Sequence, residues 1–217
     1  REWELLPWFE RTKIFMKAAD LLAANVTNGW RYRINAATMH GQSKNAFQAE
    51  VDSACEMIDL FRFNASYYER LLQEQPISIT GQHNSVEYRG LEGFVLAITP
   101  FNFTAIGGNL AAAPAMCGNT IVWKPSETQG LSAYRTMQLF MEAGLPPGVI
   151  NFIPAPGPVV GDIALKHPEL AGVHFTGSTG TFNHIIKSVG TNIETFHTYP
   201  RIVGETGGKD FVFADPS

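Results

Sequence analysis

Two polar side chains in this sequence, Asn102 and Glu205, have neighbours that would let them act on a carbonyl group. Asn102 lies in the segment TPFNF (residues 99–103), and Glu205 lies in the glycine-rich segment GETGGK (residues 204–209). An amide N–H aimed at a reacting carbonyl oxygen stabilises the negative charge that develops there, typically by roughly 3–4 kcal/mol. Flanking glycines allow a ligand to approach closely, so the carboxylate could act as a general base. The plainer alternatives are that the amide closes its own turn and that the glycine-rich segment is a surface turn.

A third segment, WKPSE (residues 123–127), places a cation and a carboxylate at the end of an apolar run. Lys124 can donate to a ribose hydroxyl or a phosphate, and Glu127 can accept hydrogen bonds from ribose hydroxyls. The alternative is a solvated lysine followed by a glutamate in the first turn of a helix, where the helix dipole favours negative charge. The residue types fit both interpretations equally well.

A fourth segment, FTGSTGT (residues 175–181), is rich in glycine and hydroxyl side chains and leads from a strand-like run into a helical pattern. Backbone N–H groups at the start of a helix bind anions, and small residues let a pyrophosphate approach closely. The candidate residues are Gly177, Ser178, Thr179, Gly180 and Thr181. The spacing departs from the common G-x-G-x-x-G fingerprint. A Ser or Thr helix cap is the alternative.

The elements that must position these segments are short apolar runs separated by helical patterns. The runs are Phe94–Ile98, Thr120–Trp123, Val149–Ile153, Gly172–Phe175 and Phe211–Phe213, and the helical patterns are Ala105–Cys117, Leu131–Ala143, Val159–Lys166 and Gly180–Val189. Runs that are apolar on both faces are typical of parallel strands covered by helices. We therefore predict an α/β fold, a parallel sheet with helices on both faces, over residues 93–217. Ligands of such sheets bind beyond the carboxyl ends of the strands, where the polar segments are expected.

The front of the chain, residues 1–75, has the apolar spacing of core-facing helices. One stripe lies between Leu5 and Ala24 and includes Phe9, and a second consists of Phe47, Val51, Ala54, Cys55, Ile58 and Phe61. We predict a helical segment that packs on the sheet.

Between these two parts, residues 76–92 have the pattern of a β-hairpin. Ile77–Ile79 and Val86–Tyr88 alternate in polarity around the turn-prone residues 81–84. Such a hairpin could leave the body of the domain and pair elsewhere.

Composition excludes several classes of protein. Hydrophobic residues make up 45% and charged residues 17% of the 217 residues, which predicts an ordered globular protein. The net charge is −4 with the charges scattered, so a nucleic acid partner is not expected. No apolar run is long enough to cross a bilayer. The two cysteines, Cys55 and Cys117, lie in apolar stretches and are interpreted as small buried side chains.

Taken together and in order, these segments resemble the aldehyde dehydrogenase superfamily. The resemblance covers most of the chain and rests on the Pro-Phe-Asn turn, GNT (118–120), WKPSE (123–127), AGLP (143–146), FTGS (175–178) and GETGGK (204–209). Within the superfamily the sequence is similar to the subgroup that oxidises glutamate γ-semialdehyde to glutamate in proline breakdown. That similarity rests on YRGLEGF (88–94), NFTAIGGNL (102–110) and FHTYPR (196–201).

The resemblance implies a Rossmann-like fold, NAD as cofactor and a small-molecule aldehyde as substrate. Asn102 would be the oxyanion donor, and Glu205 the base that activates water for thioester hydrolysis. Thr99 and Lys124 would contact NAD, residues 177–181 would hold its pyrophosphate, and Glu127 would bind ribose. Cys117 matches no catalytic position of the family. The resemblance also implies a homo-oligomer, with residues 76–92 as part of a subunit-bridging element, and a place in the mitochondrial matrix.

The nucleophile of the family is a cysteine that lies well downstream of the base. Twelve residues follow Glu205 in this chain and none is a cysteine. We therefore expect these residues by themselves to bind NAD without completing the reaction. Two other hypotheses stay open: a truncated, non-catalytic module or structural subunit, and a nucleotide-binding protein without aldehyde chemistry. The last one predicts that Asn102 and Glu205 point to unrelated surfaces.

Overall fold

The computed structural model describes residues 2–24 and 29–216, so the outer limits of the predicted units, Arg1 and Ser217, lie outside the described residues. Its centre is a five-stranded sheet with the order β3-β2-β1-β4-β5, in which every neighbouring pair is parallel. The strands are β1 (Phe94–Ile98), β2 (Thr120–Lys124), β3 (Ile150–Phe152), β4 (Leu170–Thr176) and β5 (Arg201–Glu205). The predicted α/β fold with a parallel sheet is therefore confirmed.

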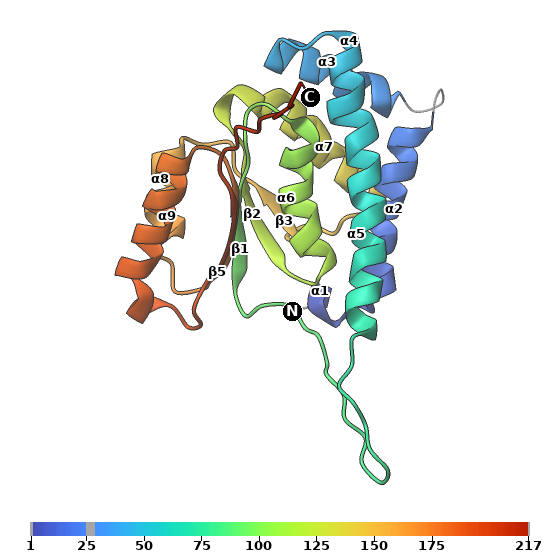
Figure 1. The fold of residues 1–217 in the computed structure, drawn as a ribbon, viewed down its shortest axis with the longest axis vertical. Helices are drawn as coiled ribbons and strands as arrows, with labels where there is room; N and C mark the ends of the chain where they lie inside the picture. The colour runs from blue at the N-terminus through green and yellow to red at the C-terminus, as the bar shows by residue number, and fades with distance from the viewer. Residues whose placement is uncertain (1, 25–28, 217) are drawn as a thin grey trace.

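Helices cover both faces of this sheet (Figure 1). On one face lie α6 (Thr104–Met116) and α7 (Gly130–Ala143), with α2 (Trp8–Ala23), α3 (Trp30–Gln42) and α5 (Glu56–Gln73) packed outside them. On the other face lie α8 (Gly157–Ala164) and α9 (Thr179–Thr191). The shorter elements are α1 (Glu2–Leu5), α4 (Ala46–Ala49), the π-helix Glu50–Cys55 and the 3-10 turns Glu127–Gln129 and Ile193–Thr195.

The strand sequences explain why both faces are covered. Successive side chains of a strand point to opposite faces. In β1, Val95 and Ala97 belong to the core formed with α2, α5, α6 and α7, whereas Leu96 belongs to the core formed with α8 and α9. The predicted end of α7 is also confirmed, because Gly144 caps that helix in the left-handed conformation, with φ 105°. No helix in the described part of the chain is long and apolar enough to cross a membrane.

The helical prediction for the front of the chain is confirmed, but the buried stripe assigned to residues 47–61 is partly wrong. Phe47 and Val51 are 77% and 50% exposed, and Cys55 is also exposed. For Val51 and Cys55 the cause is the π-helix Glu50–Cys55, whose wider turn changes which residues face the core relative to a regular helix. Phe47 precedes the π-helix and lies on the outer face of the short helix α4. The buried face continues after it through Met57 and Phe61. In the first stripe Phe9 is likewise exposed.

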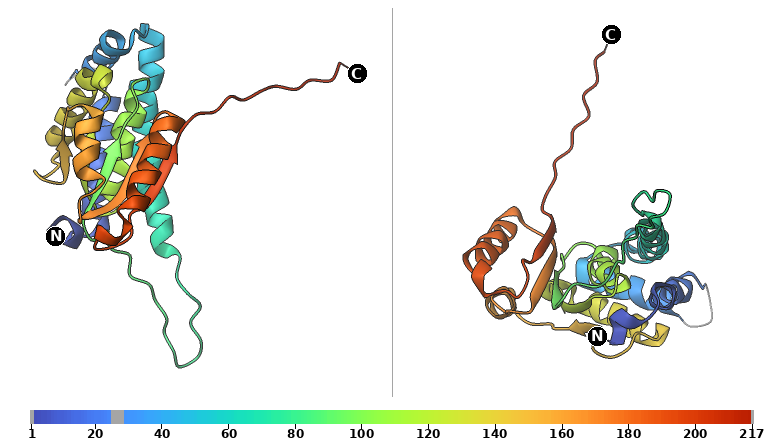
Figure 2. Two further views of the ribbon diagram at one scale, coloured as in Figure 1. Left: turned by 90° about the vertical axis from the view of Figure 1, so that its left-hand side faces the viewer. Right: turned by 90° about the horizontal axis from the view of Figure 1, so that it is seen from below.

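The predicted β-hairpin reverses its direction as expected but contains no strand. Its two limbs protrude from the body of the molecule (Figures 1 and 2), and the only β-type pairing in this segment is a single bridge between Ile79 and Gln82. Side chains hold the limbs together instead: Gln75 bonds the N–H and C=O groups of Val86, at 2.8 and 3.2 Å, and Asn84 donates to the carbonyl of residue 77 at 2.8 Å. A two-stranded ladder without a packed face is marginally stable, which explains the difference.

The prediction of a strand at Phe211–Phe213 is wrong. Residues 206–216 form no helix or strand and run away from the sheet (Figure 2). The fifth strand is β5, which pairs with β4 and was not among the predicted runs. β5 is an outermost strand of the sheet, so only Ile202 of its five residues is even partly buried. Its sequence therefore lacks the apolar run of a central strand.

A buried cation, Arg11, joins the helical layer together, and we predict that its replacement by lysine destabilises the fold. Arg11 is 5% exposed and donates to the carbonyls of Met116 at 3.1 Å and Glu4 at 3.0 Å and to the hydroxyl of Tyr68 at 2.9 Å. Lysine lacks the planar fork that reaches several acceptors at once. Because a hydrogen bond to a charged group contributes about 1.5–3 kcal/mol, Arg11→Lys should lower the free energy of unfolding by about 2–3 kcal/mol in urea titrations.

The matched control is Arg62→Lys, which alters an exposed ion pair with Asp20. Exposed pairs contribute roughly 0–1 kcal/mol, so the urea midpoint should change little. Equal losses in the two variants would show that the buried bonds of Arg11 do not stabilise the fold.

Candidate functional site

The carboxyl ends of the strands gather the predicted site segments at one edge of the sheet. In the strand register Ile98 pairs with Lys124 and with Phe175, and Thr176 pairs with Glu205. The segments that follow these positions are therefore neighbours. The sheet order reverses between β1 and β4, since the chain builds outwards from β1 to β3 and then crosses to β4. Such a switch point is where open α/β sheets bind ligands.

Lys124 is a buried cation at this edge. Lys124 is 8% exposed. Its burial lowers the pKa of its ammonium, while the negative charge of Glu127 raises that pKa. Its ammonium lies beside the start of α8, where a Cβ added to Gly157 would stand 3.6 Å from Nζ. Within the described residues no group accepts a hydrogen bond from this ammonium. A solvated surface lysine, the alternative considered above, would be exposed, so the geometry favours a ligand partner.

Thr99 and Glu127 flank this lysine in different ways. Thr99 is 3% exposed, its Oγ1 accepts a hydrogen bond from Trp123 Nε1 at 3.1 Å, and its N–H donates to the carbonyl of Lys124 at 3.2 Å. Glu127 is exposed and begins a 3-10 turn, as the helix-start alternative expected. An exposed carboxylate at this place is equally available to a ribose.

The segment at residues 177–181 forms both a helix cap and a close turn. The Oγ of Ser178 accepts from the N–H of Thr181 at 3.1 Å, so the capping alternative is confirmed. A Cβ at Gly177 would lie 2.7 Å from the ring of Phe175, which leaves room for glycine alone unless that ring moves. The cap uses one N–H group of the first turn of α9, and the N–H groups of residues 179 and 180 stay available at the helix end.

Asn102 lies in the turn between β1 and α6, with its side chain exposed. Its backbone carbonyl accepts a hydrogen bond from Lys44 Nζ, whereas its carboxamide makes no hydrogen bond to another described residue. The alternative that this amide closes its own turn therefore has no support in the geometry.

Glu205 is the last residue of β5 and is exposed at the same edge. Its carboxylate accepts from Thr176 Oγ1 at 3.4 Å, and its carbonyl accepts from the N–H of Gly177 at 3.1 Å. It belongs to a paired strand rather than to a surface turn. Asn102 follows β1 and Glu205 ends β5, and both strands pair with β4, so the two residues lie at the same end of the sheet. This differs from the hypothesis without aldehyde chemistry, which predicts that they point to unrelated surfaces.

Sequence reasoning missed three polar residues of the helical layer that reach this edge. Lys44 contacts the Asn102 turn and forms an ion pair with Asp52 at 2.6 Å. Glu56, at the start of α5, is half-buried, and its pKa is raised by burial and by the negative charges of Asp52 and Glu205. Neither acidic residue had a signal in the sequence, because the π-helix changes which residues face the sheet.

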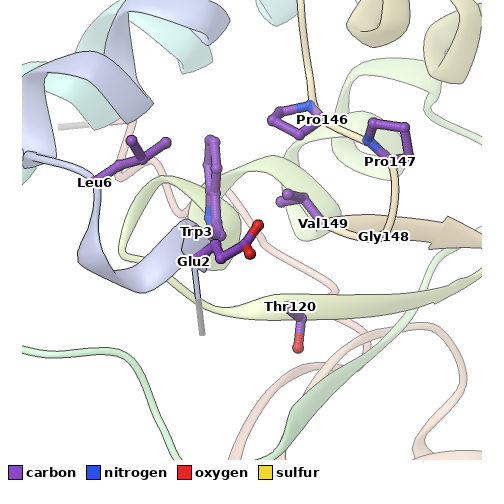
Figure 3. A pocket seen from close by; sticks show the side chains of 8 residues that line it. All are labelled: Glu2, Trp3, Leu6, Thr120, Pro146, Pro147, Gly148 and Val149. Carbon is purple, nitrogen blue, oxygen red and sulfur yellow. The ribbon is translucent and has the colours of Figure 1, made fainter.

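A cavity of about 570 Å³ lies at the other end of the strands, near the start of β2 (Figure 3). Trp3, Pro146 and Pro147 line it together with Thr120, the first residue of β2. It contains none of the predicted site residues. In the described part of the chain no group of three or more His, Cys, Asp or Glu side chains could hold a metal ion.

Comparison with known proteins gives a consistent result. The model of the aldehyde dehydrogenase family matches residues 1–216. The mitochondrial delta-1-pyrroline-5-carboxylate dehydrogenase of Homo sapiens is 52% identical over all 217 residues, which are 38% of its length, so this chain spans well under half of such relatives. The NAD-bound crystal structure of the corresponding Mycobacterium tuberculosis enzyme is 58% identical with a TM-score of 0.93, covering 96% of this chain and 38% of that one. The NAD-bound Thermus 1-pyrroline-5-carboxylate dehydrogenase is 30% identical with a TM-score of 0.85, and the match covers 96% of this chain and 40% of that one.

Proposed function

We propose, from the premise that this chain belongs to the aldehyde dehydrogenase family, that it is the NAD-binding part of an enzyme that oxidises glutamate γ-semialdehyde to glutamate. The observation that carries the proposal is the gathering of the four site segments at the carboxyl ends of the strands, around the switch point between β1 and β4. Identities of 52% and 58% to pyrroline-5-carboxylate dehydrogenases, over nearly the whole chain, support the choice of substrate.

The residues at this edge fit a dinucleotide. Lys124 is buried, and its ammonium has no hydrogen-bond acceptor among the described residues, which suits a ribose hydroxyl or a phosphate. Gly177 and the start of α9 suit the pyrophosphate, since helix N-termini bind anions. Thr99 lies beside Lys124 and donates its N–H to the Lys124 carbonyl. The carboxylate of Glu127 would repel a 2′-phosphate, so we propose NAD rather than NADP.

In the proposed reaction, bound NAD supplies the hydride acceptor. Asn102 donates its amide N–H to the aldehyde oxygen as that oxygen becomes negative, and no hydrogen bond to a described residue competes for this amide. Glu205 accepts a proton from the water that releases the product. The nucleophile, which the family resemblance assigns to a cysteine, would come from the part of the relatives' length that this chain does not match.

The proposed function is tested with the full-length protein that contains this chain. It should reduce NAD in the presence of glutamate γ-semialdehyde with a higher kcat/KM than with butanal, which lacks the α-amino acid group. Equal kcat/KM values would contradict the substrate proposal. The alternative of a non-catalytic module would stand if NAD were bound but no aldehyde were oxidised.

Replacing Lys124 with alanine should weaken NAD binding by roughly 10–150-fold, because a charge-assisted hydrogen bond contributes about 1.5–3 kcal/mol. Isothermal titration calorimetry of NAD into this chain measures the effect directly. Lys13→Ala, which removes an exposed lysine 74% accessible in its side chain, is the control and should bind NAD normally. An unchanged Kd in Lys124→Ala would exclude this contact.

Two proposals concern the whole protein. The protruding residues 76–92, with Ile77 86% exposed, fit a subunit-bridging role in a homo-oligomer (Figure 1). The human and rat relatives are named mitochondrial, which supports the mitochondrial matrix as the location. The name of the Agaricus bisporus relative states no compartment.

A further inference from the structure

Lys44 joins the π-helix to the Asn102 turn, which lies 58 positions away in sequence. Its ammonium donates to Asp52 Oδ2 at 2.6 Å and to the backbone carbonyl of Asn102, and it stands 4.1 Å from the centre of the Phe103 ring. The side chains of Lys44 and Asp52 are only 17% and 4% exposed. The segment before α4, the π-helix and the Asn102 turn therefore meet at one largely buried cation.

Asp52 holds this cation and lies near the start of α6. Burial raises the pKa of Asp52, whereas the Lys44 ammonium and the backbone N–H groups of Thr104 and Ala105 lower it. A carboxylate near the first turn of a helix interacts favourably with the helix dipole. The same carboxylate thus pairs with Lys44 and places its negative charge near the first turn of the helix that begins directly after the turn.

The backbone of the turn is held at two successive carbonyls. Lys44 binds the carbonyl of Asn102, and Gln129, which is 1% exposed, donates from Nε2 to the carbonyl of Phe103 at 2.8 Å. The Asn102 carboxamide has no hydrogen bond to another described residue, so no such bond sets its direction, and the position of its backbone becomes important. An amide that stabilises a developing oxyanion must be oriented before the reaction, because misplacement by about 1 Å can cost roughly 10²-fold in rate.

We propose that Lys44, held by Asp52, is a positioning residue that orients the Asn102 carboxamide toward the reacting carbonyl oxygen. This inference rests on the proposed function, in which Asn102 is the oxyanion donor. Lys44 touches neither substrate nor cofactor in this proposal. It acts by fixing the turn, and the Phe103 ring, which receives the cation on its face, is fixed with it.

The test is a double-mutant cycle in the full-length enzyme, with kcat for aldehyde oxidation, the Kd of NAD and the thermal midpoint measured for each variant. Lys44→Met should lower kcat by roughly 10–100-fold with an unchanged Kd of NAD, whereas Asn102→Ala should lower it by roughly 10²–10³-fold. In the Asn102→Ala background, Lys44→Met should change kcat by less than about twofold, because the group that it orients is gone. Lys44→Arg should restore most of kcat, since a guanidinium can still donate to both acceptors.

Two further variants separate positioning from folding. Lys166→Met removes an exposed lysine paired with Asp162 and should leave kcat unchanged. Asp52→Asn keeps the size and shape of the Asp52 side chain but removes the charge that holds Lys44, so it should lower kcat with the same non-additivity, even if Lys44→Met proves too unstable to assay.

The outcomes distinguish the two levels of the proposal. If Asn102→Ala lowered kcat but Lys44→Met lowered it by an equal factor in both backgrounds, Lys44 would not act through Asn102 and the positioning role would be overturned. The same conclusion would follow if Lys44→Met left kcat unchanged. If Asn102→Ala itself left kcat unchanged, the oxyanion role in the proposed function would fail first.

Discussion

Replacing Asn102 with alanine should lower kcat for aldehyde oxidation by roughly 10²–10³-fold in the full-length enzyme, with little change in the Kd of NAD. The physical reason is that the amide N–H is needed only when the carbonyl oxygen becomes negative, so its loss raises the energy of the transition state more than that of bound substrate. Stopped-flow measurement of NADH formation under saturating NAD gives the rate of aldehyde oxidation before product release. The fold should be retained, because the carboxamide makes no hydrogen bond to the described chain.

The control for this prediction is Asn183→Ala, which removes an exposed amide from α9 and should leave kcat unchanged. A rise in KM without a fall in kcat would mean that the Asn102 amide binds substrate and transition state equally, which is uniform binding rather than oxyanion stabilisation. Unchanged kcat and KM would remove Asn102 from the reaction altogether.

The central strands could be predicted from sequence because their environment is uniform. β1 and β2 are covered by helices on both faces, so nearly every residue is apolar and the run itself marks the strand. β5 has a neighbour on one side only, and its residues Arg201 and Glu205 are exposed, so no apolar run marks it. Residues 211–213 are also a short apolar run, but they form no strand. An apolar run by itself does not reveal whether a neighbouring strand is present to pair with it.

The candidate site could be predicted to the extent that it depends on strand ends. Thr99 directly follows β1 and Lys124 ends β2, two strands that their apolar runs predict, and parallel pairing brings such ends together without further information. Glu205 ends β5, which no apolar run marks, so only its glycine-rich segment and the family resemblance pointed to it. Lys44 and Asp52 could not be found in this way. Lys44 reaches Asn102 across 58 positions of sequence, and Asp52 faces inward because of a π-helix that the regular period of 3.6 residues does not anticipate.

Replacing Glu205 with glutamine should convert steady NADH production by the full-length enzyme into a burst followed by slow turnover. If Glu205 accepts a proton from the attacking water, an amide in its place cannot do so, and loss of a general base typically costs roughly 10²–10⁴-fold in that step. Formation of the thioester does not need this proton transfer, so one early pulse of NADH close to one per active site should precede the slow phase. Glutamine can keep the contact with Thr176 Oγ1, so β5 should remain paired with β4.

The distinguishing measurement is the amplitude of the burst rather than the loss of turnover. A full burst with slow turnover places Glu205 after thioester formation, as a base for water. Loss of the burst together with turnover would place it earlier, for example in activation of the thiol, and would contradict the proposed order of its action. Unchanged turnover would mean that this exposed carboxylate only ends a strand. Glu194→Gln, in an exposed 3-10 turn away from the strand ends, should show normal turnover and no burst, because it removes the same charge from the surface without altering the site.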